Sequence, residues 1–151
     1  MKLTDSIYIM NLIRDFANFG IINKEDSAYY HKLRLEKVSK EDVISTLMKR
    51  SKLTYTDIPH KYRVDINFVS LLIRANKGFV VQVWDVDKNL AYDALDKLND
   101  EELSNVICSI RPSLIYVMHQ YLKERRNVED CKKMIEVNNN EVEQNIDSKK
   151  I

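Results

Sequence analysis

The chain has 151 residues, of which 44% are hydrophobic, and its 24 basic and 23 acidic side chains leave a net charge of +1. A chain of this length buries about two-thirds of its unfolded surface, so it can fold without a metal ion or a disulfide. The near balance of charge argues against a dedicated nucleic-acid-binding protein, which usually carries a clear basic excess.

An amphipathic helix is predicted at the N-terminus. Its apolar face has the i, i+3, i+4, i+7 spacing of one helical side and consists of Ile9, Leu12, Ile13 and Phe16. We expect the helix to begin after Thr4 or Asp5 as N-cap, because either side chain can accept from free backbone N–H groups. Gly20 marks its end, since glycine readily adopts the left-handed conformation that follows many helices.

Two further helices are predicted next. The second covers about 24–37 with Asn23 as N-cap, and its apolar stripe consists of Tyr29 or Tyr30 and then Leu33. The third begins after Ser39, with Asp42 three residues later in an approximate capping box. Its inward-facing side chains are Val43, Ile44, Leu47 and Met48.

The middle of the chain predicts a short helix and then a longer one. The segment 56–62 has Thr56 as a possible cap and Pro59 in its first turn, where the missing N–H is not needed. Asp65 is the expected N-cap of a helix over 66–75. Its apolar side chains are Phe68, Val69, Leu72 and Ile73.

The segment 79–84 allows two interpretations. Its β-branched and aromatic residues are typical of a strand, but a short apolar run does not distinguish a strand from a buried helix. Comparison with LTYTDI and LIYVMH, which also stand between helical segments, favours a short buried helix. Gly78 would then end the preceding helix, and Trp84 would lie in the core with its indole N–H bonded near Asp85 or Asp87.

Helices also dominate the rest of the chain. They are predicted over 88–98 after Asp87, 100–110 after Asn99, 113–125 after Pro112, and 128–137 after Asn127. Residues 139–151 are polar and aperiodic and predict a disordered tail. The predicted fold is all-α, a compact bundle or short helical-hairpin array of about eight to nine helices. One domain would cover 1–138, with an N-terminal helix pair at 1–38.

A weak similarity between segments of the chain indicates an internal repeat over 40–137. VISTLMKRSK aligns with FVSLLIRANK at an offset of 25 residues, and KYRVDINFVSLLI aligns with ERRNVEDCKKMIE. The stretches DIPHKYRVDINFVSLLIRANKGF and IRPSLIYVMHQYLKERRNVEDCKKMI resemble short helical repeats of unknown function in bacterial, phage and giant-virus proteins. The acidic stretch 85–102 interrupts the period. The resemblance implies a helical-hairpin scaffold and brings no catalytic residues.

No catalytic or nucleotide-binding motif is found in the sequence. There is no P-loop, dinucleotide-binding glycine motif, nucleophile elbow or HExxH, and the three histidines do not have metal-ligand spacing. We therefore expect no cofactor, no metal ion and no enzymatic activity. Cys108 and Cys131 stand at apolar helical positions and predict buried thiols. No apolar run is long enough to span a membrane, which favours a cytoplasmic protein, or a host-cell intracellular one if the source is viral.

Charge is unevenly distributed and provides the candidate binding residues. Residues 1–63 carry 12 basic and 8 acidic side chains, whereas 85–102 carry 2 basic and 7 acidic ones. Basic side chains at helix ends and interleaved tyrosines could bind a peptide or stack on bases, and the acidic stretch could select a basic partner. Ordinary helix-end charges and core-edge tyrosines are the simpler explanation. The candidates are Tyr55, Tyr62, Arg63, Asp85, Asp87, Tyr121, Arg125 and Arg126.

These patterns favour a non-enzymatic protein–protein interaction module, such as a viral or phage inhibitor or adaptor. One alternative is a nucleic-acid-associated regulator that uses the basic helix ends. Another is a viral helical bundle resembling cell-death regulators, an analogy that rests on size and helicity alone. The sequence leaves the identity of the protein partner open.

Overall fold

The computed structural model describes residues 1–109 and 112–126 of the chain. Within these residues it contains α-helices and one 3-10 turn but no strand, so the all-α prediction is confirmed. The elements are α1 Leu3–Asn18, α2 Lys24–Leu35, α3 Lys40–Arg50, η1 Tyr55–Asp57, α4 His60–Arg63, α5 Ile66–Ala75, α6 Phe79–Val86, α7 Lys88–Asp96, α8 Asp100–Cys108 and α9 Pro112–Arg125. The predicted last helix, the predicted tail and Cys131 lie outside the described residues.

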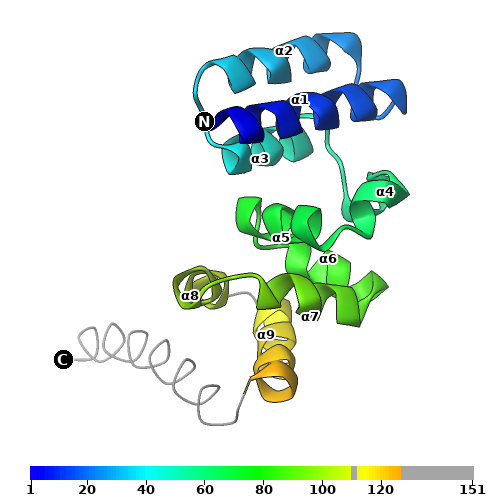
Figure 1. The fold of residues 1–151 in the computed structure, drawn as a ribbon. Coiled ribbons are helices and arrows are strands. Elements are labelled where there is room, and N and C mark those ends of the chain that lie inside the picture. Colours follow the sequence, from blue (N-terminus) through cyan, green and yellow to red (C-terminus); the bar gives the residue numbers. More distant parts are fainter. Residues whose placement is uncertain (110–111, 127–151) are drawn as a thin grey trace, which may run out of the picture.

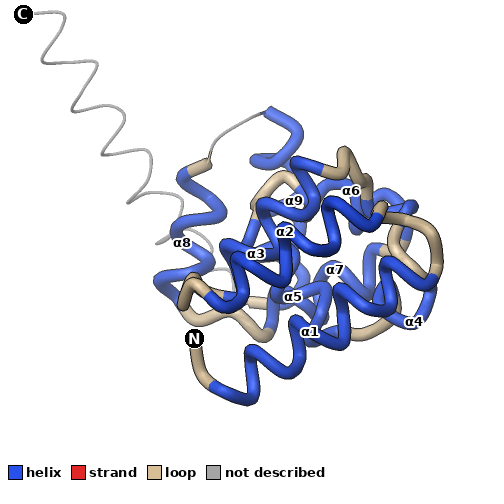
Figure 2. The backbone as a smooth tube through the Cα atoms, turned by 90° about the horizontal axis from the view of Figure 1, so that it is seen from above, coloured by secondary structure: helices blue, strands red, loops and turns tan. Residues whose placement is uncertain are grey.

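The helices form two groups that follow one another along the chain (Figure 1). Helices α1, α2 and α3 contact one another in the first group. The chain then passes through η1 and α4 to the second group, where α7 packs on α5 and α6, and α9 packs on α6 and α7. The groups meet mainly where α3 packs on α5. Helix α8 lies to one side of the molecule in both views (Figures 1 and 2).

One continuous cluster of buried side chains runs through both groups. Every residue of the predicted stripes on α1 and α3 is buried in it, which confirms those stripes. Three aromatic rings connect the groups, because Tyr62 of α4 packs edge-on against Phe16 of α1 and against Phe68 of α5. The ring centroids are 5.5 Å and 5.2 Å apart, respectively, which is the favoured range for such pairs.

Local capping chemistry sets most helix starts, as predicted. Side chains accept a hydrogen bond from a backbone N–H of the first turn at Asn23, Ser39, Asp65, Asp87 and Asn99. Asn99 also receives the reciprocal bond of a capping box, since its backbone N–H donates to Glu102. Gly20 has a φ of 73° and follows the end of α1, which confirms its predicted role.

Two predicted helix starts are wrong. Helix α1 begins at Leu3 with Lys2 as its N-cap, and no side chain caps it. The segment predicted as one helix over 56–62 consists of the 3-10 turn η1, capped by Thr54, and the separate helix α4. Pro59 explains this division, because it holds the preceding residue Ile58 in an extended conformation that ends the turn.

The segment 79–84 belongs to α6, which confirms the interpretation as a helix over that as a strand. The role predicted for Gly78 is wrong, because Gly78 has a right-handed φ of −62° and is the N-cap of α6. The preceding helix ends instead at extended Asn76, whose side chain accepts from the Gly78 N–H at 3.1 Å. Asparagine therefore forms the turn through its own side chain, and no left-handed residue is needed.

Trp84 and Cys108 also depart from expectation. Trp84 is half-buried and packs edge-on against Tyr116, with ring centroids 6.0 Å apart. Its Nε1 is buried and has no acceptor among the described residues, so neither Asp85 nor Asp87 satisfies it. Cys108 is exposed, because it follows the buried stripe of α8 and lies off that face.

The two best-aligned repeat segments form α3 and α5, which pack against each other. The chain leaves the two helices differently: Lys52, after α3, has a left-handed φ of 53°, whereas Asn76, after α5, is extended. Arg63 ends α4, which packs on α5, whereas Arg126 follows α9, which packs on α6 and α7.

Candidate interaction surface

The three candidate tyrosines lie in the core. Tyr55, Tyr62 and Tyr121 are almost completely buried, so their ring faces are not available to stack on a base or a peptide. Their hydroxyls donate internally, to the Arg63 carbonyl at 2.7 Å, to Asp15 Oδ2 at 2.5 Å and to Asp96 Oδ1 at 2.7 Å, respectively. Burial, followed by the bond to Asp96, raises the pKa of Tyr121 to about 12. The stacking expectation is therefore not met.

The candidate arginines are also engaged within the chain. Arg125 Nη1 lies 2.9 Å from Asp93 Oδ1 and 2.9 Å from Asp96 Oδ2. The pKa of Arg126 is raised chiefly by its hydrogen bond with the Tyr121 hydroxyl. Arg63 is half-buried, and its Nε is buried without an acceptor among the described residues.

Internal pairing neutralises much of the acidic stretch 85–102. Asp93 and Asp96 share Arg125, Glu102 lies beside Arg74, and Asp87 caps α7. Asp85 is exposed. The acidic surface that the sequence charge predicts is therefore smaller than the charge count suggests.

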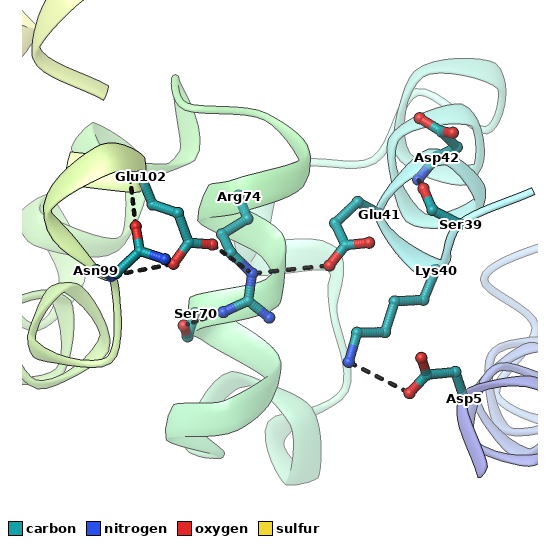
Figure 3. Close-up of polar contacts among 9 residues, drawn as sticks. All are labelled: Asp5, Ser39, Lys40, Glu41, Asp42, Ser70, Arg74, Asn99 and Glu102. Carbon is teal, nitrogen blue, oxygen red and sulfur yellow. Dashed lines mark hydrogen bonds and ion pairs between the residues drawn. The ribbon is translucent and has the colours of Figure 1, made fainter. Parts of the chain in front are cut away.

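A polar cluster surrounds Arg74 of α5 and includes carboxylates from two other helices (Figure 3). Arg74 Nε lies 3.8 Å from Glu41 Oε1 of α3 and 3.6 Å from Glu102 Oε2 of α8. Arg74 Nη1 also donates to Ser70 Oγ at 3.1 Å. Figure 3 shows the guanidinium between the two carboxylates, so one cation joins three helices.

Two hollows border this cluster, of about 460 Å³ and 240 Å³, and Arg74 lines both. The larger hollow is lined by two acidic and three basic side chains: Asp5 and Asp65, and Lys40, Arg74 and Lys97. The smaller one is lined by two of each: Glu41 and Glu102, and Arg74 and Lys77. Asp5 and Lys40 already pair with each other at 3.3 Å. Arg74 likewise pairs with Glu41 and Glu102, so these charges are engaged with one another and the cluster acts as an internal tie.

Helix α1 presents a second apolar face to solvent. Leu3, Ile7 and Met10 are 76%, 45% and 37% exposed and follow one another at i, i+4 and i+7. Arg14 continues the same line and is exposed as well. We call these four residues the α1 seam. The sequence prediction covers only the first apolar face of α1, although the same helical spacing identifies the second.

The charges of α1 are sorted between its faces. Asp5 pairs with Lys40 Nζ at 3.3 Å, and Asp15 pairs with Lys61 Nζ at 3.1 Å, so both acids of the helix are turned toward the protein. Lys2 and Arg14 are exposed, and neither forms an ion pair with any described residue. The seam is therefore apolar with basic ends.

Leu35 extends the apolar surface at one end of the seam. It is exposed at the C-terminal end of α2. Arg34 Nη1 donates to Ser6 Oγ at 2.8 Å, which places this end of α2 beside the start of α1. Leu35 and Leu3 therefore lie at the same end of the helix pair.

A second exposed apolar group lies at the other end of the fold. Ile115 and Tyr116 of α9 are exposed, as is Val86 at the end of α6. Ile115 and Tyr116 are adjacent in sequence and point to different sides of α9, so they form no stripe along the helix. The α1 seam is the longer aligned surface.

Comparison of the chain with protein-family models, curated proteins and solved structures found no match. Among the described residues, no helix combines the length and the apolar character needed to cross a membrane. The same part of the chain contains no group of three or more acidic, histidine or cysteine side chains placed to hold a metal ion.

Proposed function

We propose that the protein is a protein–protein interaction module that docks its partner on the α1 seam. The observation that carries the proposal is the exposed line of Leu3, Ile7 and Met10 on a helix whose opposite side is fully buried. The exposed parts of these side chains do not contribute to the core, and contiguous exposed apolar surface typically marks a binding site. Binding would remove these side chains from water.

The geometry supports this function better than a nucleic-acid-associated one. Nucleic-acid binding would use the basic helix ends. Arg125, however, forms ion pairs with two carboxylates, and Arg126 is hydrogen-bonded with a buried tyrosine. Tyrosines that would stack on bases are in the core. The seam instead supports an adaptor or inhibitor, which acts by occupying a partner's surface.

Affinity capture with matched variants tests the proposal. Ile7→Glu places a charge on the seam. Ile115→Glu places the same charge on α9, at an isoleucine that is 49% exposed, close to the 45% of Ile7. The full-length chain and both variants would be immobilised and treated with extract of the cells that produce the protein. We expect proteins that the unaltered chain and Ile115→Glu retain and Ile7→Glu loses. Identical capture by Ile7→Glu, or loss with Ile115→Glu alone, would contradict the proposal.

A further inference from the structure

The spacing of the α1 seam matches the interface between two packed helices. Leu3, Ile7, Met10 and Arg14 are separated by four, three and four residues, which is the alternation of d and a positions in a heptad. A stripe of only these positions is the narrow seam of a helix pair, whereas a helix that packs into a core has a broader face. We infer that the seam binds one amphipathic helix that carries acidic residues beside its apolar positions, an inference that rests on the proposed function.

The charges of α1 determine the sign of the charge that a matching partner carries. Both acids of the helix are held against the protein by Lys40 and by Lys61 with Tyr62, so they contribute little to the outer face. Lys2 and Arg14 stand at the two ends of that face without an ion partner among the described residues. A docked helix with acids near both ends would pair with them, which fixes register and speeds association.

A second copy of the chain does not fit this surface. Pairing two seams in parallel places Arg14 of one copy beside Arg14 of the other, and the antiparallel arrangement places Arg14 near Lys2. Either arrangement brings like charges together, and the outer face of α1 offers no acid to separate them. The same sorting of charge that attracts an acidic helix therefore opposes self-association.

A membrane surface is also a poorer match. Helices that lie in a bilayer interface present a broad apolar face with aromatic residues and lysines along its border. The seam is one residue wide, contains no aromatic ring, and has the charged Arg14 in its own line. Its dimensions suit the apolar stripe of one helix.

Selection from a peptide library tests the partner chemistry. Phage-displayed peptides of about 20 residues, long enough to form helices, would be selected on the immobilised full-length chain. We expect enriched peptides with apolar residues at i, i+4 and i+7 and an excess of Asp and Glu. Their affinity should fall with added salt and drop at least about tenfold with Ile7→Glu, while Ile115→Glu leaves it unchanged. Selection on the double variant Lys2→Glu with Arg14→Glu should enrich basic peptides instead.

The outcomes separate this inference from the proposed function. Peptides that depend on Ile7 but show no acidic excess, or that keep the same charge after the double reversal, overturn the inference and leave the seam as a docking site. Peptides insensitive to Ile7→Glu, together with unchanged capture from extract, overturn both. Ile7-dependent dimerisation, measured by sedimentation, would assign the seam to a second copy. Ile7-dependent binding to phosphatidylserine vesicles would assign it to a membrane; either result overturns the acidic-helix inference.

Discussion

At the scale of single residues, buried tyrosines bonded to carboxylates connect distant parts of the chain. Tyr62 of α4 donates to Asp15 of α1, and Tyr121 of α9 donates to Asp96 of α7. The bond from Tyr62 is the main cause that lowers the pKa of Asp15. Burial and the same bond raise the pKa of Tyr62. These hydroxyls therefore hold the fold together and are not contact groups for a partner.

Asp15 gives the stability a dependence on pH. Its folded pKa is lower than the unfolded value of about 3.9, so the ionised group stabilises the fold above about pH 4 and this contribution is lost as pH falls through the folded pKa. Asp15→Asn should lower the free energy of unfolding by about 1 kcal/mol at pH 7, since one charged hydrogen bond is weakened. Between pH 5 and pH 3, the free energy of unfolding of this variant should fall less than that of the unaltered protein. Urea unfolding at each pH measures the difference. Exposed Asp85→Asn is the control, and identical behaviour of the two variants would refute the assignment.

Two isoleucines of α1 test which side of the helix supports the fold. Ile13 is completely buried, whereas Ile7 lies on the seam. Ile13→Ala should lower the free energy of unfolding by about 2–5 kcal/mol because it leaves a cavity. Ile7→Ala should change it by less than about 0.5 kcal/mol. Equal losses in thermal unfolding would show that the seam is part of the core and would remove the basis of the proposed function.

At the scale of elements, two helices end in the same motif with different residues. After α1, the Ile21 N–H donates to the Phe16 carbonyl at 3.0 Å around left-handed Gly20. After α3, the Leu53 N–H donates to the Met48 carbonyl at 2.9 Å around left-handed Lys52. Glycine adopts this conformation without strain, and lysine does not.

Exchanging these residues should have opposite effects. Lys52→Gly should raise the free energy of unfolding by about 0.5–1 kcal/mol, because relief of the strained φ exceeds the added entropy of the unfolded chain. Gly20→Ala should lower it by about 1 kcal/mol. No atom lies within 4 Å of the added Cβ at Gly20, so the loss is due to the backbone alone. Urea unfolding of both variants is the measurement, and changes of the same sign would contradict the motif.

At the scale of the whole molecule, Arg74 links the first helical group with α8. It lies between Glu41 of α3 and Glu102 of α8, and all three side chains are a quarter to a third exposed. Exposed ion pairs contribute little individually, but a shared cation couples α3 of the first group with α8. We therefore expect a small, measurable coupling energy.

A double-mutant cycle measures this coupling. Arg74→Met, Glu102→Gln and the double variant should give a coupling energy of about 0.5–1 kcal/mol in urea unfolding. Lys77→Met is a matched control on the same side of the fold, because Lys77 lines the same hollow and has no ion pair with a described residue. Additive effects of Arg74→Met and Glu102→Gln would show that the contact does not tie the helices.

Local signals in the sequence predicted most of the fold. Asn23, Ser39 and Asp65 cap helices as expected because capping depends on side chains within one turn. The turn at Gly78 was predicted wrongly because Asn76 can form the same bend by a different bond. Sequence spacing does not distinguish these two solutions.

The candidate surface was much less predictable. The chemistry of Tyr62 and Tyr121 is that of contact residues, but their exposure depends on which helices pack over them. Arg125 is a basic side chain at a helix end, and its partners Asp93 and Asp96 are about 30 residues away in sequence, so the sequence does not reveal the pairing. The seam residues Leu3, Ile7 and Met10 have a helical spacing that the sequence displays. Only packing shows that this face stays outside.

Mapping where a selected peptide binds tests whether the α1 seam is the docking surface. Backbone amide shifts of the full-length protein, recorded by NMR with and without the peptide, locate the contact surface. We predict that the largest changes occur along α1 at Leu3, Ile7 and Met10, with further changes near Leu35. Changes concentrated on α9 around Ile115 and Tyr116, or around Arg74, would contradict the claim that the α1 seam is the docking surface.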